Sequence, residues 1–236
     1  MWNNMDFIAE NIRRIRAQMA EAAVQAGRDP GEVLLCAATK MNPAEAVRAA
    51  IAGGVDCCGE NKVQELTEKA AQNAYAGAPV HFIGHLQKNK AKLVVGAVDL
   101  IQSVDSLELL QLLDRLAAAR HLRQDVLLEI NIGGEASKSG FSVSDAWQAL
   151  EQMETFSSLR LRGLMAIPPV SEKKGDNLRY FAKMYELYVD MRGKKYDNTS
   201  IDCLSMGMSG DFADAISQGS TMVRVGTSIF GPRNYG

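Results

Sequence analysis

The stretch VLLCAATK, residues 33–40, decides the fold, because it is an almost unbroken apolar run that ends in Thr39 and Lys40. Near-continuous apolar strands are typical of parallel sheets that are covered on both faces. Seven further runs of this kind cover residues 55–60, 80–85, 99–104, 125–132, 160–167, 200–206 and 221–230. The stretches between them are amphipathic and carry helix-start signals, as at Asn42-Pro43 and Ser144-Asp145.

Eight strands that alternate strictly with helices imply right-handed parallel crossovers. The α/β fold that accommodates them most naturally is the (β/α)8 TIM barrel, in which the eight strands close into a ring. We predict this barrel over residues 33–230. The competing fold is a doubly wound open sheet, whose G-x-G-x-x-G turn after the first strand is missing from this sequence.

The residues before the first strand predict an extra N-terminal helix over 5–26, because apolar side chains recur there at helical spacing. Gly27 and Pro30 end this helix, which we expect to form a lid or base. No linker, repeat or low-complexity stretch divides the chain, so we predict a single domain over 1–236.

Composition favours a small-molecule partner. The chain has 236 residues, of which 47% are apolar and 23% charged, and its net charge of −2 comes from mixed signs. Nucleic acids and anionic membranes require a concentrated basic patch, which the sequence lacks. The start, MWNNMDFIAE, has no leader pattern, and no run approaches the length of a membrane span, so we expect a cytoplasmic protein.

The four cysteines form no C-x-x-C pair, and most lie in apolar runs, so we expect them to be reduced and structural; they are Cys36, Cys57, Cys58 and Cys203. His81 and His85 could share one face of a strand. We predict no metal site there, because no Asp, Glu or Cys at ligand spacing completes the pair.

Lys40 is the first candidate for chemistry, because function gathers at the C-terminal ends of barrel strands. A dry core beside the barrel mouth favours a neutral, nucleophilic amine. The alternative is an ordinary solvated lysine at a strand end.

Two glycine-rich segments after the seventh and eighth strands predict a phosphate site. In SMGMSGDFADAI, residues 205–216, Gly207, Ser209 and Gly210 allow backbone amides to converge at a helix start. Gly226 and Thr227 follow the last strand, and barrels commonly hold phosphate between these two loops. The alternative is that these glycines only make turns and a helix cap.

Arg224 lies between valines on a core strand, so it must meet an acceptor inside the barrel. Two acceptors fit: a carboxylate such as Glu129, or a ring nitrogen of a ligand. A nucleophilic lysine, a phosphate cradle and a buried arginine together suit pyridoxal 5′-phosphate.

Three further charged residues are assigned other roles. Glu60 is interpreted as a strand-end contact, Glu65 as a helix-surface charge, and Lys138 as a loop lysine near the same mouth.

The sequence resembles the pyridoxal phosphate homeostasis proteins, the YggS/PROSC group, which share the barrel of the N-terminal domain of alanine racemase. The matching segments are AATK (37–40), GENKVQE (59–65), HFIGHLQKNK (81–90), INIGGEASKSGF (130–141), RGLMAI (162–167), SMGMSGDF (205–212) and VRVGTSIFG (223–231). Lys62 stands where this group often has an aromatic or apolar residue.

The resemblance implies a fold-type III pyridoxal-phosphate site. It implies that Lys40 forms the Schiff base, that Ser209, Gly226 and Thr227 surround the phosphate, that Arg224 faces the pyridine nitrogen and that Asn61 lines the ring. The cofactor-binding residues are then Lys40, Asn61, Met206, Gly207, Ser209, Arg224, Gly226 and Thr227, with no catalytic residue and no metal ligand.

The expected function is a non-catalytic, monomeric carrier that holds pyridoxal phosphate reversibly, serves vitamin B6 homeostasis and passes the cofactor to apo-enzymes. The rivals are an amino-acid racemase of the same fold and a Schiff-base aldolase. Racemases with this barrel add a mostly β domain and borrow a partner tyrosine, whereas this chain stops at Gly236. Its tyrosines (Tyr75, Tyr180, Tyr185, Tyr188, Tyr196 and Tyr235) fall outside the predicted strand ends.

Overall fold

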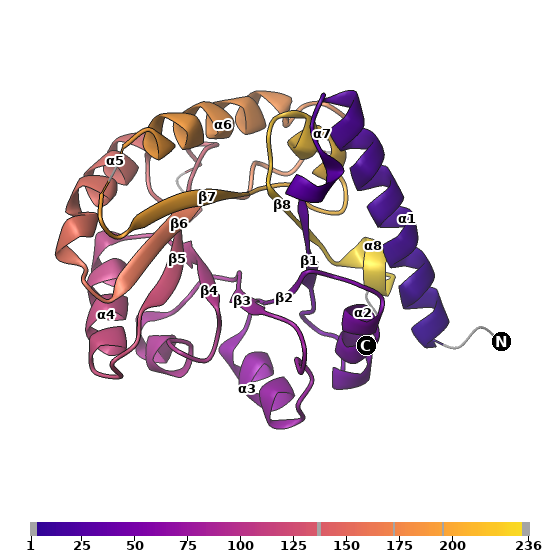
Figure 1. Cartoon of the computed structure of the whole chain (residues 1–236), viewed down its shortest axis with the longest axis horizontal. Coiled ribbons are helices and arrows are strands. Elements are labelled where there is room, and N and C mark those ends of the chain that lie inside the picture. Colours follow the sequence, from indigo (N-terminus) through magenta and orange to yellow (C-terminus); the bar gives the residue numbers. More distant parts are fainter. Residues whose placement is uncertain (1–3, 136–137, 172, 195, 233–236) are drawn as a thin grey trace.

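Eight parallel strands close into a barrel in the computed structural model, which describes residues 4–135, 138–171, 173–194 and 196–232 (Figure 1). The strands follow one another in chain order, and β1 pairs with both β2 and β8. Their bounds are β1 Leu34–Ala38, β2 Cys57–Glu60, β3 Val80–Phe82, β4 Leu100–Val104, β5 Gln124–Ile130, β6 Leu159–Ala166, β7 Thr199–Ser205 and β8 Met222–Val225. The predicted (β/α)8 fold is therefore confirmed.

Helices surround the barrel on its outer side (Figure 1). They are α1 Asn4–Gln25, α2 Ala44–Ala52, α3 Val63–Ala71, α4 Leu107–Ala118, α5 Val143–Gln152, α6 Leu178–Arg192, α7 Phe212–Ser217 and α8 Thr227–Phe230. Short 3-10 helices are η1 Pro30–Glu32, η2 Lys88–Leu93 and η3 Met153–Thr155, and η2 stands where a regular α-helix would join β3 to β4. Helix α5 starts one residue after its cap Ser142, whose side chain accepts the N–H of Asp145, so the start signal lies two residues before the predicted Ser144.

Helix α1 is neither a lid nor a base. It packs beside α2, α7 and α8 in the outer ring (Figure 1). Its apolar stripe is buried, and the side chain of Asn11 donates to the carbonyl of Ile229 in α8 (2.9 Å). The physical reason is that α7 and α8 are too short to cover the β8–β1 side of the barrel, so α1 supplies the missing apolar face.

Two predicted strands, 80–85 and 221–230, end at least three residues before the apolar pattern does. The chain leaves β3 after Phe82 and passes so close to Asn61 that a side chain at Gly84 would overlap its backbone, so the two histidines do not share a strand face. The chain leaves β8 after Val225 and forms α8 from Thr227, although residues 226–230 continue the apolar pattern.

The core has two parts. The larger lies between the sheet and the helices, and the smaller fills the barrel interior with Cys36, Cys57, Leu100, Leu127, Met165, Cys203 and Met222. All four cysteines are free and buried, as expected.

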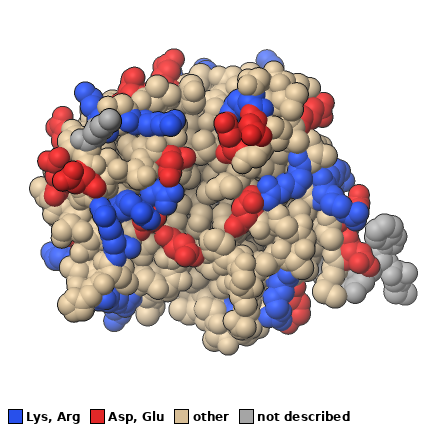
Figure 2. Space-filling view, in the orientation of Figure 1, with Lys and Arg blue, Asp and Glu red and all other residues tan. Residues whose placement is uncertain are grey.

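Basic and acidic side chains are mixed over the face of the molecule shown in Figure 2. None of the described helices is long and apolar enough to cross a bilayer.

Candidate functional site

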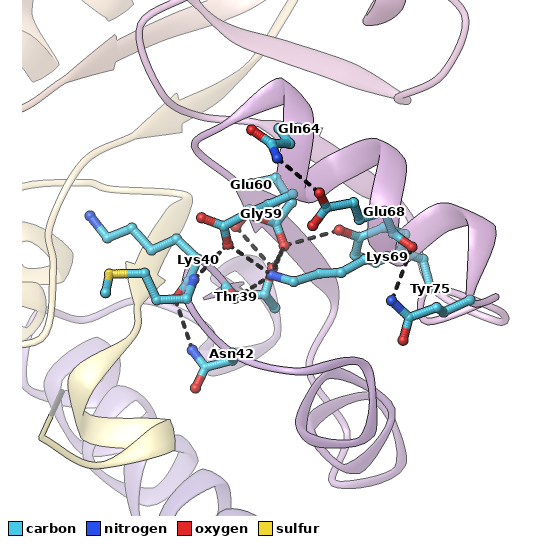
Figure 3. Close-up of polar contacts among 12 residues, drawn as sticks. Thr39, Lys40, Asn42, Gly59, Glu60, Gln64, Glu68, Lys69 and Tyr75 are labelled. Carbon is cyan, nitrogen blue, oxygen red and sulfur yellow. Dashed lines mark hydrogen bonds and ion pairs between the residues drawn. The ribbon is translucent and has the colours of Figure 1, made fainter. Parts of the chain in front are cut away.

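Lys40 directly follows Thr39 at the C-terminal end of β1, as predicted. Its carbonyl accepts a hydrogen bond from Asn42 Nδ2 (3.0 Å), and its side chain extends away from Lys69 and Tyr75 (Figure 3). Together with Gly226 and Thr227 it lines a pocket of about 220 Å³. Residues from opposite ends of the sequence therefore meet here, because β1 and β8 are neighbours in the barrel.

A buried polar cluster fixes the backbone on the N-terminal side of Lys40 (Figure 3). Lys69 Nζ on α3 donates to the carbonyl of Thr39 (2.8 Å) and to Glu60 Oε1 (2.7 Å). The hydroxyl of Tyr75 donates to the same carboxylate oxygen (3.0 Å), and Glu60 is fully buried. Burial is the main cause that raises the pKa of Tyr75, followed by the neighbouring Glu60.

The C-terminal side of Lys40 is fixed by Glu65, which contacts Lys69 Nζ (3.2 Å) and accepts the N–H of Met41 (2.6 Å). The interpretation of Glu65 as a helix-surface charge was therefore wrong, and sequence reasoning missed Lys69 altogether. The available signal was the four-residue spacing of Glu65 and Lys69 on α3, which places both on one helix face. Met41 adopts a left-handed conformation (φ 61°), which this clamp helps to hold.

Ser209 joins the two loops that were predicted to hold phosphate. Its Oγ accepts the N–H groups of Gly226 (3.3 Å) and Ser228 (3.5 Å). A side chain at Gly226 would approach the carbonyl oxygen of Ala38 to 3.2 Å, so a small residue is needed between β1 and β8. Two backbone donors and one hydroxyl thus converge beside the pocket that Lys40 lines. Sequence reasoning missed Ser228, because its contribution comes from the backbone and not from its side chain.

The sequence predicts an anion site at the start of α7. The carboxylate of Asp211 stands there, where it accepts the N–H of Met208 (2.7 Å) and the Nδ2 group of Asn177 (2.8 Å). The amides that the structure brings together on Ser209 Oγ come from the loop after β8. Gly207 is needed for packing, because its φ is +93° and a side chain would lie 2.5 Å from Ala215 Cβ.

Arg224 is buried inside the barrel, with 4% of its surface exposed. It donates to Ser205 Oγ (2.6 Å) and to the carbonyl of Ala166 (2.9 Å). Among the described residues it makes no ion pair with Glu129, the protein acceptor suggested by the sequence. Burial lowers the pKa of Arg224 below its ordinary value, and burial together with Asp105 raises that of Glu129.

Two further predicted residues flank this end of the barrel. Asn61 follows β2, and its Oδ1 is buried without a hydrogen-bond partner in the described part of the chain. Met206 is fully buried, and its N–H donates to the carbonyl of Met222 (3.1 Å). An orphaned amide oxygen is unusual in a folded interior and fits a ligand contact.

Lys138 lies at the rim, where its amine contacts Glu135 Oε2 (2.7 Å) and donates to the carbonyl of Pro168 (3.3 Å). It lines a pocket of about 330 Å³ together with Asn61 and Glu129. Its position near the mouth agrees with the sequence interpretation.

The two histidines have different surroundings. His85 is exposed and contacts Asp105 Oδ2 (3.1 Å). His81 is buried beside Cys36 and Cys57, whose donor atoms lie within 4.8 Å of its ring. Cysteines therefore do stand at ligand distance from His81, contrary to the prediction from spacing along the chain, because β1 and β2 bring Cys36 and Cys57 beside it.

The residues at this end fit a phosphorylated aldehyde with a ring nitrogen. Lys40 supplies an amine, Ser209 and two amides form an anion cradle, and Arg224 and Asn61 supply polar groups deeper in the mouth. The pocket between β1 and α8 gives the amine and the cradle a common opening.

Comparison with known proteins identifies the family. A model described as alanine racemase, N-terminal domain, matches residues 4–234. The pyridoxal phosphate homeostasis protein of Pseudomonas aeruginosa is 42% identical over 232 residues, which cover 98% of each chain, and that of Escherichia coli is 40% identical over 235 residues, which cover 98% of this chain and 99% of the other. The structure of PipY from Synechococcus elongatus with pyridoxal phosphate bound superposes with a TM-score of 0.82 at 32% identity, over 95% of this chain and all of that one (100%). The chain therefore belongs to the pyridoxal phosphate homeostasis protein family, built on the barrel of the alanine racemase N-terminal domain.

Proposed function

We propose that this protein binds pyridoxal 5′-phosphate reversibly through a Schiff base on Lys40 and acts as a non-catalytic carrier in vitamin B6 homeostasis. The observation that carries the proposal is the meeting of three groups at one barrel mouth. The amine of Lys40 and the Ser209–Gly226–Ser228 cradle open on adjoining strands, and the guanidinium of Arg224 lies beneath them.

Each residue has a defined task in this proposal. Ser209, Gly226 and Thr227 hold the phosphate, with Gly207 giving the loop its close packing. Asn61 and Met206 border the ring, and Arg224 faces the pyridine nitrogen. Bound pyridoxal phosphate supplies a reactive aldehyde on an electron-withdrawing ring. Arg224 disfavours a proton on the ring nitrogen, because a second positive charge is repelled at short range.

The hydrogen bonds around Lys40 support a protein that holds the cofactor rather than one that catalyses racemisation. The carbonyl of Thr39 is tied to the buried Lys69, and the N–H of Met41 to the partly exposed Glu65, both on α3, which fixes the amine's backbone. A racemase also needs an acid on the opposite face of its substrate. Tyr75 donates to Glu60 behind β2, whereas Tyr180, Tyr185 and Tyr188 lie on α6 and Tyr196 precedes β7. Tyr235 lies outside the described residues.

Borohydride reduction followed by peptide mapping tests the site. The purified protein is expected to show visible absorbance, and reduction should place one pyridoxyl group on Lys40. Lys40→Ala should abolish the absorbance, whereas Lys138→Ala should leave equilibrium binding nearly intact. A label found mainly on Lys62, Lys88 or Lys138 contradicts the assignment.

Incubation with L-alanine in deuterated water tests the absence of catalysis. Deuterium incorporation at Cα and formation of the D-enantiomer should both stay below about 1 s⁻¹, the lower end of ordinary enzyme rates. Faster turnover makes the protein a racemase.

Delivery is tested by mixing the loaded protein with an apo-enzyme that depends on pyridoxal phosphate. We expect the enzyme to regain activity, and a trap for free aldehyde placed in the solution distinguishes handover from release. The protein is expected to be a cytoplasmic monomer. Sedimentation of the loaded protein checks its oligomeric state.

A further inference from the structure

Two thiols and an imidazole meet inside the barrel, toward the ends of the strands opposite to Lys40. Cys36 on β1 and Cys57 on β2 are direct partners in the strand register, and His81 lies on the next strand, β3. One donor atom from each of the three lies within 4.8 Å of the other two, and all three residues are buried. The function proposed above uses none of them.

We propose that Cys36, Cys57 and His81 form a binding site for a thiophilic divalent cation of the Zn²⁺ class. The spacing suits tetrahedral coordination. Zn–S and Zn–N bonds of about 2.3 and 2.0 Å separate the sulfur and nitrogen ligands by about 3.5 Å. Cys57 Sγ and His81 Nδ1 lie 3.5 Å apart.

The atoms around the cluster supply further lone pairs. Gln102 Nε2 donates to His81 Nδ1 (2.9 Å) and to Met222 Sδ (3.2 Å), so a nitrogen lone pair and a sulfur lone pair already converge on one amide NH2 group. A cation takes the place of that group when the Gln102 side chain turns, and Met222 can then complete the set. Two thiolates with a divalent cation are neutral overall, which a dry interior tolerates better than a net charge.

The chemistry of these donors selects the cation. Thiolate, thioether and imidazole ligands favour Zn²⁺ and other thiophilic ions, whereas Mg²⁺ and Ca²⁺ require oxygen ligands. Gln102 is in turn held by Ser205, whose hydroxyl donates to Gln102 Oε1 (2.6 Å) and accepts from Arg224. The Gln102 amide is therefore anchored beside the site, and its nitrogen is the group that a cation on His81 Nδ1 displaces.

A pocket of about 360 Å³ at the N-terminal ends of the strands gives the cation a path. His81 and Met222 line it on the inside, and its charged residues are Glu32, Asp99, Asp125, Arg162 and Asp202. Carboxylates outnumber the single arginine, so the pocket attracts cations toward His81 and Met222.

The test is metal titration of the full-length protein kept reduced with a phosphine. Zn²⁺ should bind one equivalent in competition with a chromophoric chelator. Co²⁺ should give the intense visible bands of tetrahedral coordination together with thiolate-to-cobalt charge transfer. Cys36→Ala and Cys57→Ala should each weaken Zn²⁺ binding by about 100-fold or more, since even second-layer changes cost 10- to 100-fold.

Cys58→Ala is the matched control, because Cys58 is the next residue on β2, is equally buried and packs in the outer core. It should keep the wild-type affinity. Failure of the wild-type protein to bind one Zn²⁺ overturns the proposal, as does binding that survives both alanine variants. A Co²⁺ spectrum of octahedral oxygen coordination also overturns it, since the metal then sits on the carboxylates of the pocket. The wild-type cobalt spectrum and His81→Asn decide the question if a cysteine variant fails to fold.

Discussion

At the scale of single residues, we expect the hydroxyl of Ser209 to determine how strongly the phosphate is preferred. It sits at the point where the N–H groups of Gly226 and Ser228 converge. Ser209→Ala should weaken binding of pyridoxal phosphate by roughly tenfold to a hundredfold, the value of a hydrogen bond to a charged group. Binding of pyridoxal, which lacks the phosphate, should change little. Equilibrium titration with both ligands checks this.

Ser228→Ala is the control for that experiment, because it keeps the backbone N–H and removes only a hydroxyl. Its affinity for pyridoxal phosphate should stay within about twofold of the wild type. Equal losses for both ligands in Ser209→Ala would show that the serine supports the loop and not the phosphate.

Sequence reasoning at this scale finds residues whose side chains stand at strand ends. Lys40, Ser209 and Gly226 follow β1, β7 and β8, so the rule that function gathers at those ends locates them. It misses Ser228, which acts through its backbone, and Lys69, which reaches the site from the far end of α3. It also misses the cysteines beside His81, because contacts between neighbouring strands join residues that are distant in the chain.

At the scale of elements, α3 holds the end of β1 through one lysine. Lys69 is the buried partner of Glu60 and of the carbonyl of Thr39. Lys69→Met should lower the free energy of unfolding by about 3 kcal/mol, because it leaves a buried carboxylate without its counter-charge. Urea unfolding measures this.

Two companion variants sharpen the result. The double variant Glu60→Gln with Lys69→Met should recover part of the loss, since no buried charge then remains unpaired. The exposed Lys183→Met on α6 should stay within about 0.5 kcal/mol of the wild type. A Lys69→Met protein as stable as Lys183→Met would contradict the role given to this ion pair.

Strand β6 depends on Gly163, where its pairing with β5 and β7 shifts register. The residue has φ +144°, and a side chain would overlap the carbonyl oxygen of Cys203 on β7. Gly163→Ala should therefore cost at least about 3 kcal/mol in unfolding free energy.

Gly210→Ala is the control for that substitution, because a Cβ at Gly210 meets no atom within 4 Å. Thermal or urea unfolding of both variants should separate them clearly. Similar stabilities would mean that β6 and β7 adjust without cost.

Elements are predictable where the hydrophobic pattern matches the backbone and less so where packing intervenes. All eight strands were expected, because each is an apolar run. The early ends of β3 and β8 were not, since the close approach of Gly84 to Asn61 is a tertiary contact. The place of α1 also depended on the short lengths of α7 and α8, and the apolar pattern of residues 221–230 concealed α8.

At the scale of the whole molecule, a charge network at the N-terminal end of the barrel makes stability depend on pH. Asp125 accepts hydrogen bonds from Arg160 (2.7 and 2.6 Å) and Arg162 (2.8 Å), and Arg162 also pairs with Asp202. Burial alone would raise the pKa of Asp125, but the bonds from the two arginines lower it overall.

A lowered pKa in the folded state means that the stabilisation is present above the ordinary aspartate pKa of 3.8 and is lost as the pH falls through the folded value. Asp125→Asn should therefore cost about 1 kcal/mol near neutral pH, a figure that allows for the partial exposure of both arginines, and should cost progressively less as the pH falls below about 4. Urea unfolding across this range, with the exposed Asp190→Asn as control, checks the sign. A cost that grows toward acid would contradict it.

The pairing of β1 with β8 has a consequence during protein synthesis. The hydrogen bond from Asn11 to Ile229 spans 218 positions, and the edge of β1 finds its second neighbour only when β8 has been made. At about 5–20 residues per second, a ribosome takes roughly 10–40 s to make the chain between β1 and β8. Throughout this time the edge of β1 stays open to wrong pairing, and the amine of Lys40 has no anion cradle beside it. Nascent chains that stop short of residue 230 therefore cannot assemble the pocket, so any ligand held between Lys40 and Ser209 is captured only after the last helix has left the ribosome.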